Sequence, residues 1–143
     1  MILLDSNVLV YAVGRSHPLA RVAEDLLAFA DTGRFRVTAR VLEESAHVNA
    51  RIGRRRVDAR ELAGEWAATL GPVEYAAEED VADGFELWVA HDQLDLADGI
   101  LAAQAKRLDA HLVSADRAFA DVPQLHFVHL ADPDLAEKLG IAN

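Results

Sequence analysis

The chain has 143 residues, of which 52% are hydrophobic, and a formal net charge of −10 at pH 7. This length predicts a single domain over residues 1–143 with a sizeable core, and no apolar run approaches the roughly 20 residues of a membrane span. The absence of cysteine excludes disulfides and thiolate metal sites. No basic segment followed by an apolar stretch opens the sequence, so we expect no signal peptide and a cytoplasmic location.

Short apolar runs alternate with helical patterns along the chain. We predict strands at residues 1–4, 35–38, 111–114 and 125–129, with a further short strand at 73–75. We predict helices from 17 to 30, 40–51, 58–70, 78–92, 96–108 and 133–139. This alternation predicts an α/β domain whose central, mostly parallel sheet is flanked by helices on both faces.

Charge is distributed unevenly along these elements. Residues 34–60 contain eight arginines but only three acids, Glu43, Glu44 and Asp58, which gives this segment a charge of +5 and the remainder −15. Such asymmetry suggests a basic surface beside an acidic one, and an ordinary solvated helix face explains it as well. The negative total is therefore a weak argument against a nucleic-acid partner.

Two aspartates follow the carboxyl ends of predicted strands. Asp5 comes directly after residues 1–4, and Asp116 lies two residues after Ser114. In parallel sheets, ligands bind beyond these ends, at the switch point of the strand order. Both residues are therefore candidates for a site, although each alone is also explained as a turn aspartate bonded to nearby amides.

Helical periodicity separates a third acid from its solvated neighbour. At 100° per residue, the segment RVLEESAHV (40–48) places Glu44 at the edge of an apolar stripe, beside Val41. Glu43 lies almost opposite that stripe, where pairing with Arg40 explains it. Glu44 is thus the glutamate expected to face a cleft, and a boundary residue reaching water remains the alternative.

A fourth acid lies in the segment LDLADGILAAQA (94–105), which is apolar almost all round up to Gln104. A helix with this pattern should be largely buried. Asp95 fits the N-cap and Asp98 the third helical position. Capping explains Asp95 fully and Asp98 only in part, because a carboxylate inside a buried helix is costly unless its charge is compensated.

These four acids together suggest one cleft. Converging carboxylates repel one another and remain ionised together only around a cation. Carboxylate oxygens, without cysteine and without a histidine pair spaced for zinc, favour Mg²⁺ or Mn²⁺. One such ion, or two, can activate water and neutralise charge on a phosphodiester oxygen.

The four segments resemble the PIN-domain ribonucleases, in particular the VapC toxins of bacterial toxin–antitoxin pairs. The resemblance rests on LLDSNVLVYA, VTARVLEESAHV, LDLADGILAAQA and LVSADRAFADV, in family order across residues 2–122. It implies a PIN-like fold, a metal-dependent endoribonuclease that hydrolyses RNA phosphodiester bonds, and a role as the toxin of a pair. It also implies a cognate antitoxin protein and a homodimer.

The same resemblance assigns roles to individual residues. It implies that the metal ligands, for Mg²⁺ or Mn²⁺, and the catalytic residues are the four acids, Asp5, Glu44, Asp98 and Asp116. Asn7 would orient Asp5, and Ser114 would help to hold Asp116 or a phosphate oxygen. Whether Asp98 or Asp116 accepts a proton from water stays open.

The basic segment is a candidate RNA surface. Its candidates for holding phosphates are Arg51, Arg54, Arg55, Arg56 and Arg60, and a solvated turn between two helices is the alternative. Phe85, Trp88 and Trp66 occupy core-like positions, so we expect them to pack inside. The helices that carry them also offer a dimer face or an antitoxin groove.

Other functions remain to be compared with the nuclease. A receiver-like phospho-acceptor domain is disfavoured because neither Lys106 nor Lys138 follows a late strand. A haloacid-dehalogenase site lacks its second acid, because position 7 is Asn7. A non-catalytic PIN-like module that binds RNA or protein is the remaining alternative, and a cleavage assay separates it from an enzyme.

Overall fold

The computed structural model describes residues 1–14 and 16–142. Its strands form one parallel sheet in the order β2-β1-β3-β4. The strands are β1 (Ile2–Leu4), β2 (Phe35–Arg36), β3 (His111–Ser114) and β4 (His126–His129). The α/β fold class and the parallel sheet predicted from the sequence are confirmed.

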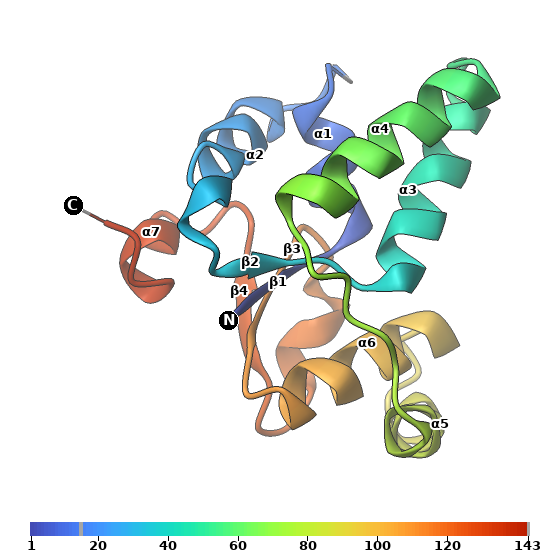
Figure 1. Cartoon of the computed structure of the whole chain (residues 1–143). Helices are drawn as coiled ribbons and strands as arrows, with labels where there is room; N and C mark the ends of the chain where they lie inside the picture. The colour runs from blue at the N-terminus through green and yellow to red at the C-terminus, as the bar shows by residue number, and fades with distance from the viewer. Residues whose placement is uncertain (15, 143) are drawn as a thin grey trace.

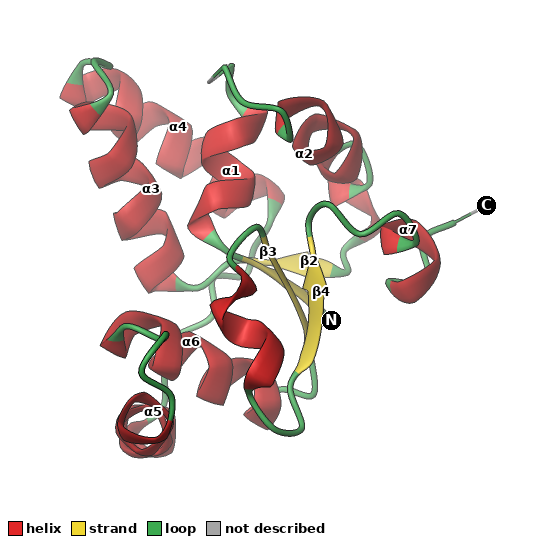
Figure 2. Cartoon of the chain, turned by 180° about the vertical axis from the view of Figure 1, so that it is seen from behind, coloured by secondary structure: helices red, strands yellow, loops and turns green. Residues whose placement is uncertain are grey.

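Helices cover both faces of this sheet (Figure 1). One side carries α1 (Ser6–Ala12), α2 (Ala20–Leu27), α3 (Ala39–Arg51) and α4 (Arg56–Thr69). The other side carries α5 (Glu78–Ala90) and α6 (Leu96–Arg107), and Figure 2 shows the same layers from behind. The remaining helical segments are η1 (Ala30–Thr32), η2 (Arg117–Asp121) and α7 (Leu135–Lys138).

The core lies on both faces of the sheet. Ile2, Leu3 and Leu4 are all fully buried although their side chains alternate in direction, because helices cover each face. Phe35 and Leu112, on the two strands that flank β1, are buried with them. Continuous apolar sequence is therefore what a central parallel strand requires.

The structure corrects the predicted elements in three places. Helix α1, which was not predicted from the sequence, begins directly after β1 because the Asp5 carboxylate caps it, accepting from Ser6 N at 2.8 Å. The second strand is shorter than predicted and ends at Arg36. The segment 73–75 contributes only an isolated bridge between Thr38 and Glu74.

Helices α5 and α6 cross at two glycines. A Cβ built on Gly99 would lie 2.6 Å from the carbonyl oxygen of Gly84, and a Cβ on Gly84 would lie 2.6 Å from Ile100 Cγ1. Only glycine lets the two backbones approach this closely. The crossing therefore fixes how far α6 lies from α5.

The predicted burial of two aromatic side chains on α5 is wrong. Phe85 and Trp88 are each 45% exposed, and they contact each other edge to face with ring centroids 6.2 Å apart. Helix α5 contacts α6 through Gly84 and the backbone of Trp88, since a Cβ on Gly99 would lie 3.5 Å from Trp88 N, and the two aromatic side chains remain half-exposed beside this contact. Trp66, by contrast, packs against the core.

None of the described helices combines the length and the apolar character that crossing a membrane requires.

Candidate active site

The candidate site begins at the carboxyl end of β1. The chain runs from β1 to β2 on one side and later adds β3 on the other, so the strand order reverses between β1 and β3. Asp5 extends the pairing there, donating its backbone N–H to Val113 O at 3.0 Å. The structure thus places Asp5 at the switch point where sites form in parallel sheets.

A small hydrogen-bond network holds the Asp5 carboxylate. Ser114 Oγ donates to Asp5 Oδ2 at 2.6 Å, and Asn7 Nδ2 lies 3.4 Å from the same oxygen. Asn7 Nδ2 also donates to Ser114 Oγ at 3.0 Å, while Asn7 Oδ1 accepts from Ala115 N at 3.0 Å. Asn7 therefore ties α1 to the end of β3 through its bonds to Ser114 and Ala115.

The same serine positions Asp116. The Asp116 backbone N–H donates to Ser114 Oγ at 3.0 Å, so Ser114 contacts both acids that follow the strands. One oxygen of the Asp116 side chain accepts from Ala118 N at 2.9 Å and caps η2. Its other oxygen has no hydrogen bond among the described residues.

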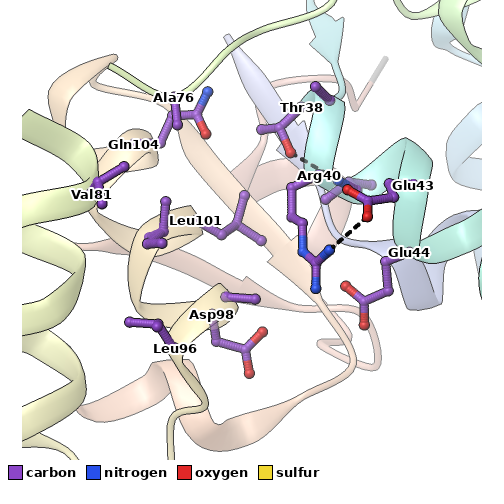
Figure 3. A pocket seen from close by; sticks show the side chains of 14 residues that line it. Thr38, Arg40, Glu43, Glu44, Ala76, Val81, Leu96, Asp98, Leu101 and Gln104 are labelled. Atoms are coloured by element: carbon purple, nitrogen blue, oxygen red, sulfur yellow. Dashed lines mark hydrogen bonds and ion pairs between the residues drawn. The ribbon is translucent and has the colours of Figure 1, made fainter. Parts of the chain in front are cut away.

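Glu44 and Asp98 come from helices on opposite sides of the sheet. Thr38 caps α3 by accepting from Val41 N at 3.1 Å, and Glu44 lies half-buried on this helix. Asp95 caps α6 by accepting from Asp98 N at 2.7 Å, as predicted from the spacing. Figure 3 shows the Glu44 and Asp98 side chains pointing toward one another.

All four predicted acids line one cavity of about 230 Å³, which we call the acid pocket. Its lining residues are Asp5, Ser6, Asn7, Val10, Tyr11, Glu44, Val48, Asp95, Asp98 and Asp116. Tyr11 and Asp95 had no predicted role in the site. Tyr11 was missed because it lies one turn after Asn7 on helix α1, which was not predicted. Asp95 was missed because capping alone already explained it.

The acid pocket disfavours negative charge. Burial raises the pKa of Asp5 to about 6, with the negative charges of Glu44 and Asp116 adding to the effect and the bonds from Ser114 and Ser6 opposing it. Burial also raises the pKa of Asp98 to about 8, reinforced by Asp5, Asp95, Asp116 and Glu44. Repulsion among these carboxylates shows that they share one electrostatic environment.

The protein supplies no cation to this pocket from its described residues. No lysine, arginine or histidine described here lies within 4.0 Å of the carboxylates of Asp5, Glu44, Asp98 or Asp116. Over residues 1–14 and 16–142, no three metal-ligating side chains are already gathered closely enough to hold an ion. Ligation by several of these acids therefore requires their side chains to rotate inward.

The predicted basic surface forms a groove between α3 and α4. This groove has a volume of about 840 Å³, and four of the five predicted arginines line it, namely Arg51, Arg54, Arg56 and Arg60. Arg55 does not, because its guanidinium pairs with the carboxylate of Asp58 at 2.8 Å.

Comparison with known proteins shows similarity over nearly the whole chain. The PIN domain family model matches residues 2–125. The ribonuclease VapC7 of Mycobacterium tuberculosis is 39% identical over 146 aligned residues, which cover 99% of this chain and 97% of that protein.

Two crystal structures share the fold. VapBC2 from Rickettsia felis, bound to a DNA fragment from its promoter, matches with a TM-score of 0.70 and 18% identity, covering 90% of this chain and 98% of that one. VapC20 of Mycobacterium tuberculosis, a toxin that cleaves the sarcin–ricin loop, matches with a TM-score of 0.70 and 18% identity, covering 87% and 98%.

Proposed function

Because the chain belongs to the PIN-domain family, we propose that it is a metal-dependent endoribonuclease and the toxin of a toxin–antitoxin pair. The observation that carries the proposal is the acid pocket, in which Asp5, Glu44, Asp98 and Asp116 meet without a cationic side chain among the described residues. The name of the 39% identical relative, a ribonuclease, supports the same activity.

The residues of the pocket fit a divalent metal ion. Their donor atoms are carboxylate oxygens, which are the ligands preferred by Mg²⁺ and Mn²⁺. The raised pKa values of Asp5 and Asp98 mean that a cation would relieve an existing repulsion. We propose that Asp5, Glu44, Asp98 and Asp116 hold Mg²⁺ or Mn²⁺, with Asn7 and Ser114 fixing the orientation of Asp5.

The proposed reaction is hydrolysis of an RNA phosphodiester. A divalent ion held by the four acids would lower the pKa of a water molecule and offset negative charge on the phosphate. A carboxylate oxygen of Asp98 or Asp116 accepts a proton as the water oxygen bonds to phosphorus. The bond from phosphorus to the 3′ oxygen breaks and that oxygen takes up a proton from solvent water, which leaves a 5′-phosphate and a 3′-hydroxyl.

The groove between α3 and α4 is proposed to hold the RNA backbone. Arg51, Arg54 and Arg56 line it, and guanidinium groups pair well with phosphate oxygens. Glu44 lies on α3, the helix that also carries Arg51, so one helix joins this groove to the acid pocket. RNA lying along α3 would therefore reach the acids.

We propose protein partners in the cytoplasm for the exposed apolar surface of α5. Phe85, Trp88 and Val89 are 45%, 45% and 73% exposed, and apolar side chains gathered in this way indicate an interaction surface. A second copy of the chain is the proposed occupant, which gives a homodimer. An antitoxin is proposed as the second protein partner, since one structural neighbour is a VapBC2 assembly.

The test of this function is cleavage of a labelled single-stranded RNA by the purified protein. We expect cleavage with Mn²⁺ or Mg²⁺, none with EDTA, and a loss of roughly 100-fold or more in the Asp5→Asn variant. Asp121→Asn is the matched control, because Asp121 is exposed and lies outside the acid pocket. Circular dichroism of both variants reports folding.

Two outcomes would contradict the proposal. The Asp5→Asn variant could cleave at the rate of the unaltered protein, which would exclude the acid pocket as the active site. Alternatively, the unaltered protein could bind RNA without turnover in either metal, which would favour the non-catalytic binding module.

A further inference from the structure

A second cavity adjoins the acid pocket and has no role in the chemistry described so far. It lies between the amino-terminal half of α3 and helix α6, with a volume of about 490 Å³, which is within the range of small-ligand sites. We call it the side pocket, and its interior is lined by Thr38, Val41, Ile100, Leu101 and Gln104. The exposed Ala76 and the ion pair of Arg40 with Glu43 lie at its rim.

The side pocket adjoins the acid pocket. Glu44 and Asp98 line both cavities, so they form the wall that the two share. Figure 3 shows these carboxylates at one end of the side pocket and Gln104, beside Ala76, at the other. A group seated in the side pocket would therefore lie next to a phosphate held at the acids.

The deep end of the side pocket contains an unpaired donor. Gln104 is only 2% exposed, and its Nε2 has no hydrogen-bond partner among the described residues. Buried polar groups are nearly always paired, because burying an unpaired one is costly. The Gln104 nitrogen is itself enclosed, so its side chain would have to rotate for a ligand in the pocket to supply the missing acceptor.

The lining dictates what kind of ligand fits. Val41, Ile100 and Leu101 offer apolar contact, and Gln104 offers a single donor. A nucleobase has these features, with two apolar faces and an edge that carries carbonyl or ring-nitrogen acceptors. A base splayed out of a single strand can enter such a pocket while its phosphate stays outside.

We propose that the side pocket binds one unpaired nucleobase of the RNA, next to the scissile phosphodiester, and that Gln104 Nε2 donates to an acceptor on its edge. The inference rests on the proposed function and adds a determinant of sequence preference. A second copy of the chain is the competing occupant. It is disfavoured because Phe85, Trp88 and Val89 lie outside the lining of the side pocket.

The test compares sequence preference in matched variants. The unaltered protein and Gln104→Met are given a library of single-stranded RNAs with randomised positions, and the cleaved ends are sequenced. We expect the unaltered protein to favour one or two of the four bases at one position beside the cut, because the acceptors lie at different places on the edge of each base. Gln104→Met keeps the shape without the donor, and we expect it to lose about tenfold of that preference.

Two control variants guard against a folding defect. Gln93→Met makes the same change at an exposed glutamine outside both pockets, and we expect the preference to be retained. A second test variant, Ala76→Trp, fills the side pocket from its exposed rim, and we expect it to weaken cleavage about tenfold. Ala82→Trp makes the same change on an exposed face outside the pocket and should not weaken it.

Binding separates failure of this inference from failure of the nuclease proposal. The same library is selected for RNA bound in EDTA, so that base preference is measured even if no variant cleaves RNA. The inference is overturned if the unaltered protein shows no base preference, or if Gln104→Met retains it. It is also overturned if Gln104→Met instead changes dimer dissociation in sedimentation velocity, because a second copy would then be the occupant.

Discussion

Two buried aspartates in this protein have opposite surroundings. Asp80, on α5, is 1% exposed, and Arg107 donates to its two oxygens at 2.8 and 2.9 Å, while Ala77 N donates at 2.7 Å. Asp5 is 5% exposed, accepts only from neutral donors, and has a pKa raised to about 6. The protein neutralises one carboxylate and leaves the other without a cation.

We propose that this difference distinguishes a structural acid from a functional one. Burial alone marks both residues, so burial is not the informative property. The informative property is the lack of a positive charge beside the carboxylate. A buried carboxylate without a cationic side chain is costly, so we propose that a bound cation compensates its charge. The acid pocket has this property, and the contact between α5 and α6 does not.

The largest expected effect comes from removing the internal cation. Arg107→Met leaves the Asp80 carboxylate buried and unpaired, which should cost about 3 kcal/mol of unfolding free energy in urea titrations at pH 7. Arg117→Met is the control, because Arg117 is exposed and makes no ion pair among the described residues. A loss below about 1 kcal/mol would show that Asp80 does not depend on its partner.

A smaller effect is expected from pH in the metal-free protein. Asp5 and Asp98 bind protons more tightly in the folded chain, with pKa values of about 6 and about 8 against an ordinary aspartate value of 3.8. Their stabilising contribution is thus complete below about pH 4 and is lost as pH rises toward about 8. We expect the Tm in EDTA to fall by about 4 °C or more between about pH 5 and about pH 8.5.

The acid pocket should be the source of that pH dependence. Asp98→Asn should flatten the upper part of the profile, from about pH 6 upward, while Asp121→Asn should retain it. Adding Mn²⁺ should raise the Tm of the unaltered protein at about pH 8 and leave Asp98→Asn less affected. A Tm that is independent of pH in EDTA would show that the acids are compensated within the chain.

The smallest effect concerns two neighbouring arginines. Arg56 lines the groove between α3 and α4, whereas Arg55 pairs with Asp58. For a single strand, losing one phosphate contact lowers the slope of log K against log salt by about 0.7. We expect this change for Arg56→Gln and a smaller one for Arg55→Gln, measured by fluorescence anisotropy. If both variants and the unaltered protein gave equal slopes, the groove between α3 and α4 would not contact the RNA.

The parts of the site that depend on local sequence were predictable. Asp95 and Asp98 are three residues apart, and a capping bond spans that separation in any helix. Glu44 was placed by the period of a single helix. Predicting that Asp5 and Asp116 lie close together required one further step, namely that the carboxyl ends of parallel strands meet at the same edge of a sheet. The parallel pairing of β1 with β3 fulfils this condition.

The remaining features depend on contacts between distant segments. Gln104 is buried as the apolar pattern of its helix predicts, but only the cavity beside it shows that its amide lacks a partner. Phe85 and Trp88 have the composition of core residues, and only the observed packing of α5 against α6 shows that they stay half-exposed. Helix α1 is seven residues long, too short for its periodicity to be distinguished from a strand.

The glycine crossing of α5 and α6 has a consequence for how this protein can vary. Asp98 immediately precedes Gly99, so one added methyl group at the crossing would separate the helices and carry the carboxylate away from Asp5. Every ionisable side chain would keep its identity in such a mutant. Substitutions at this helix contact would therefore reduce the activity of the acid pocket in small steps, while leaving its four acids unchanged.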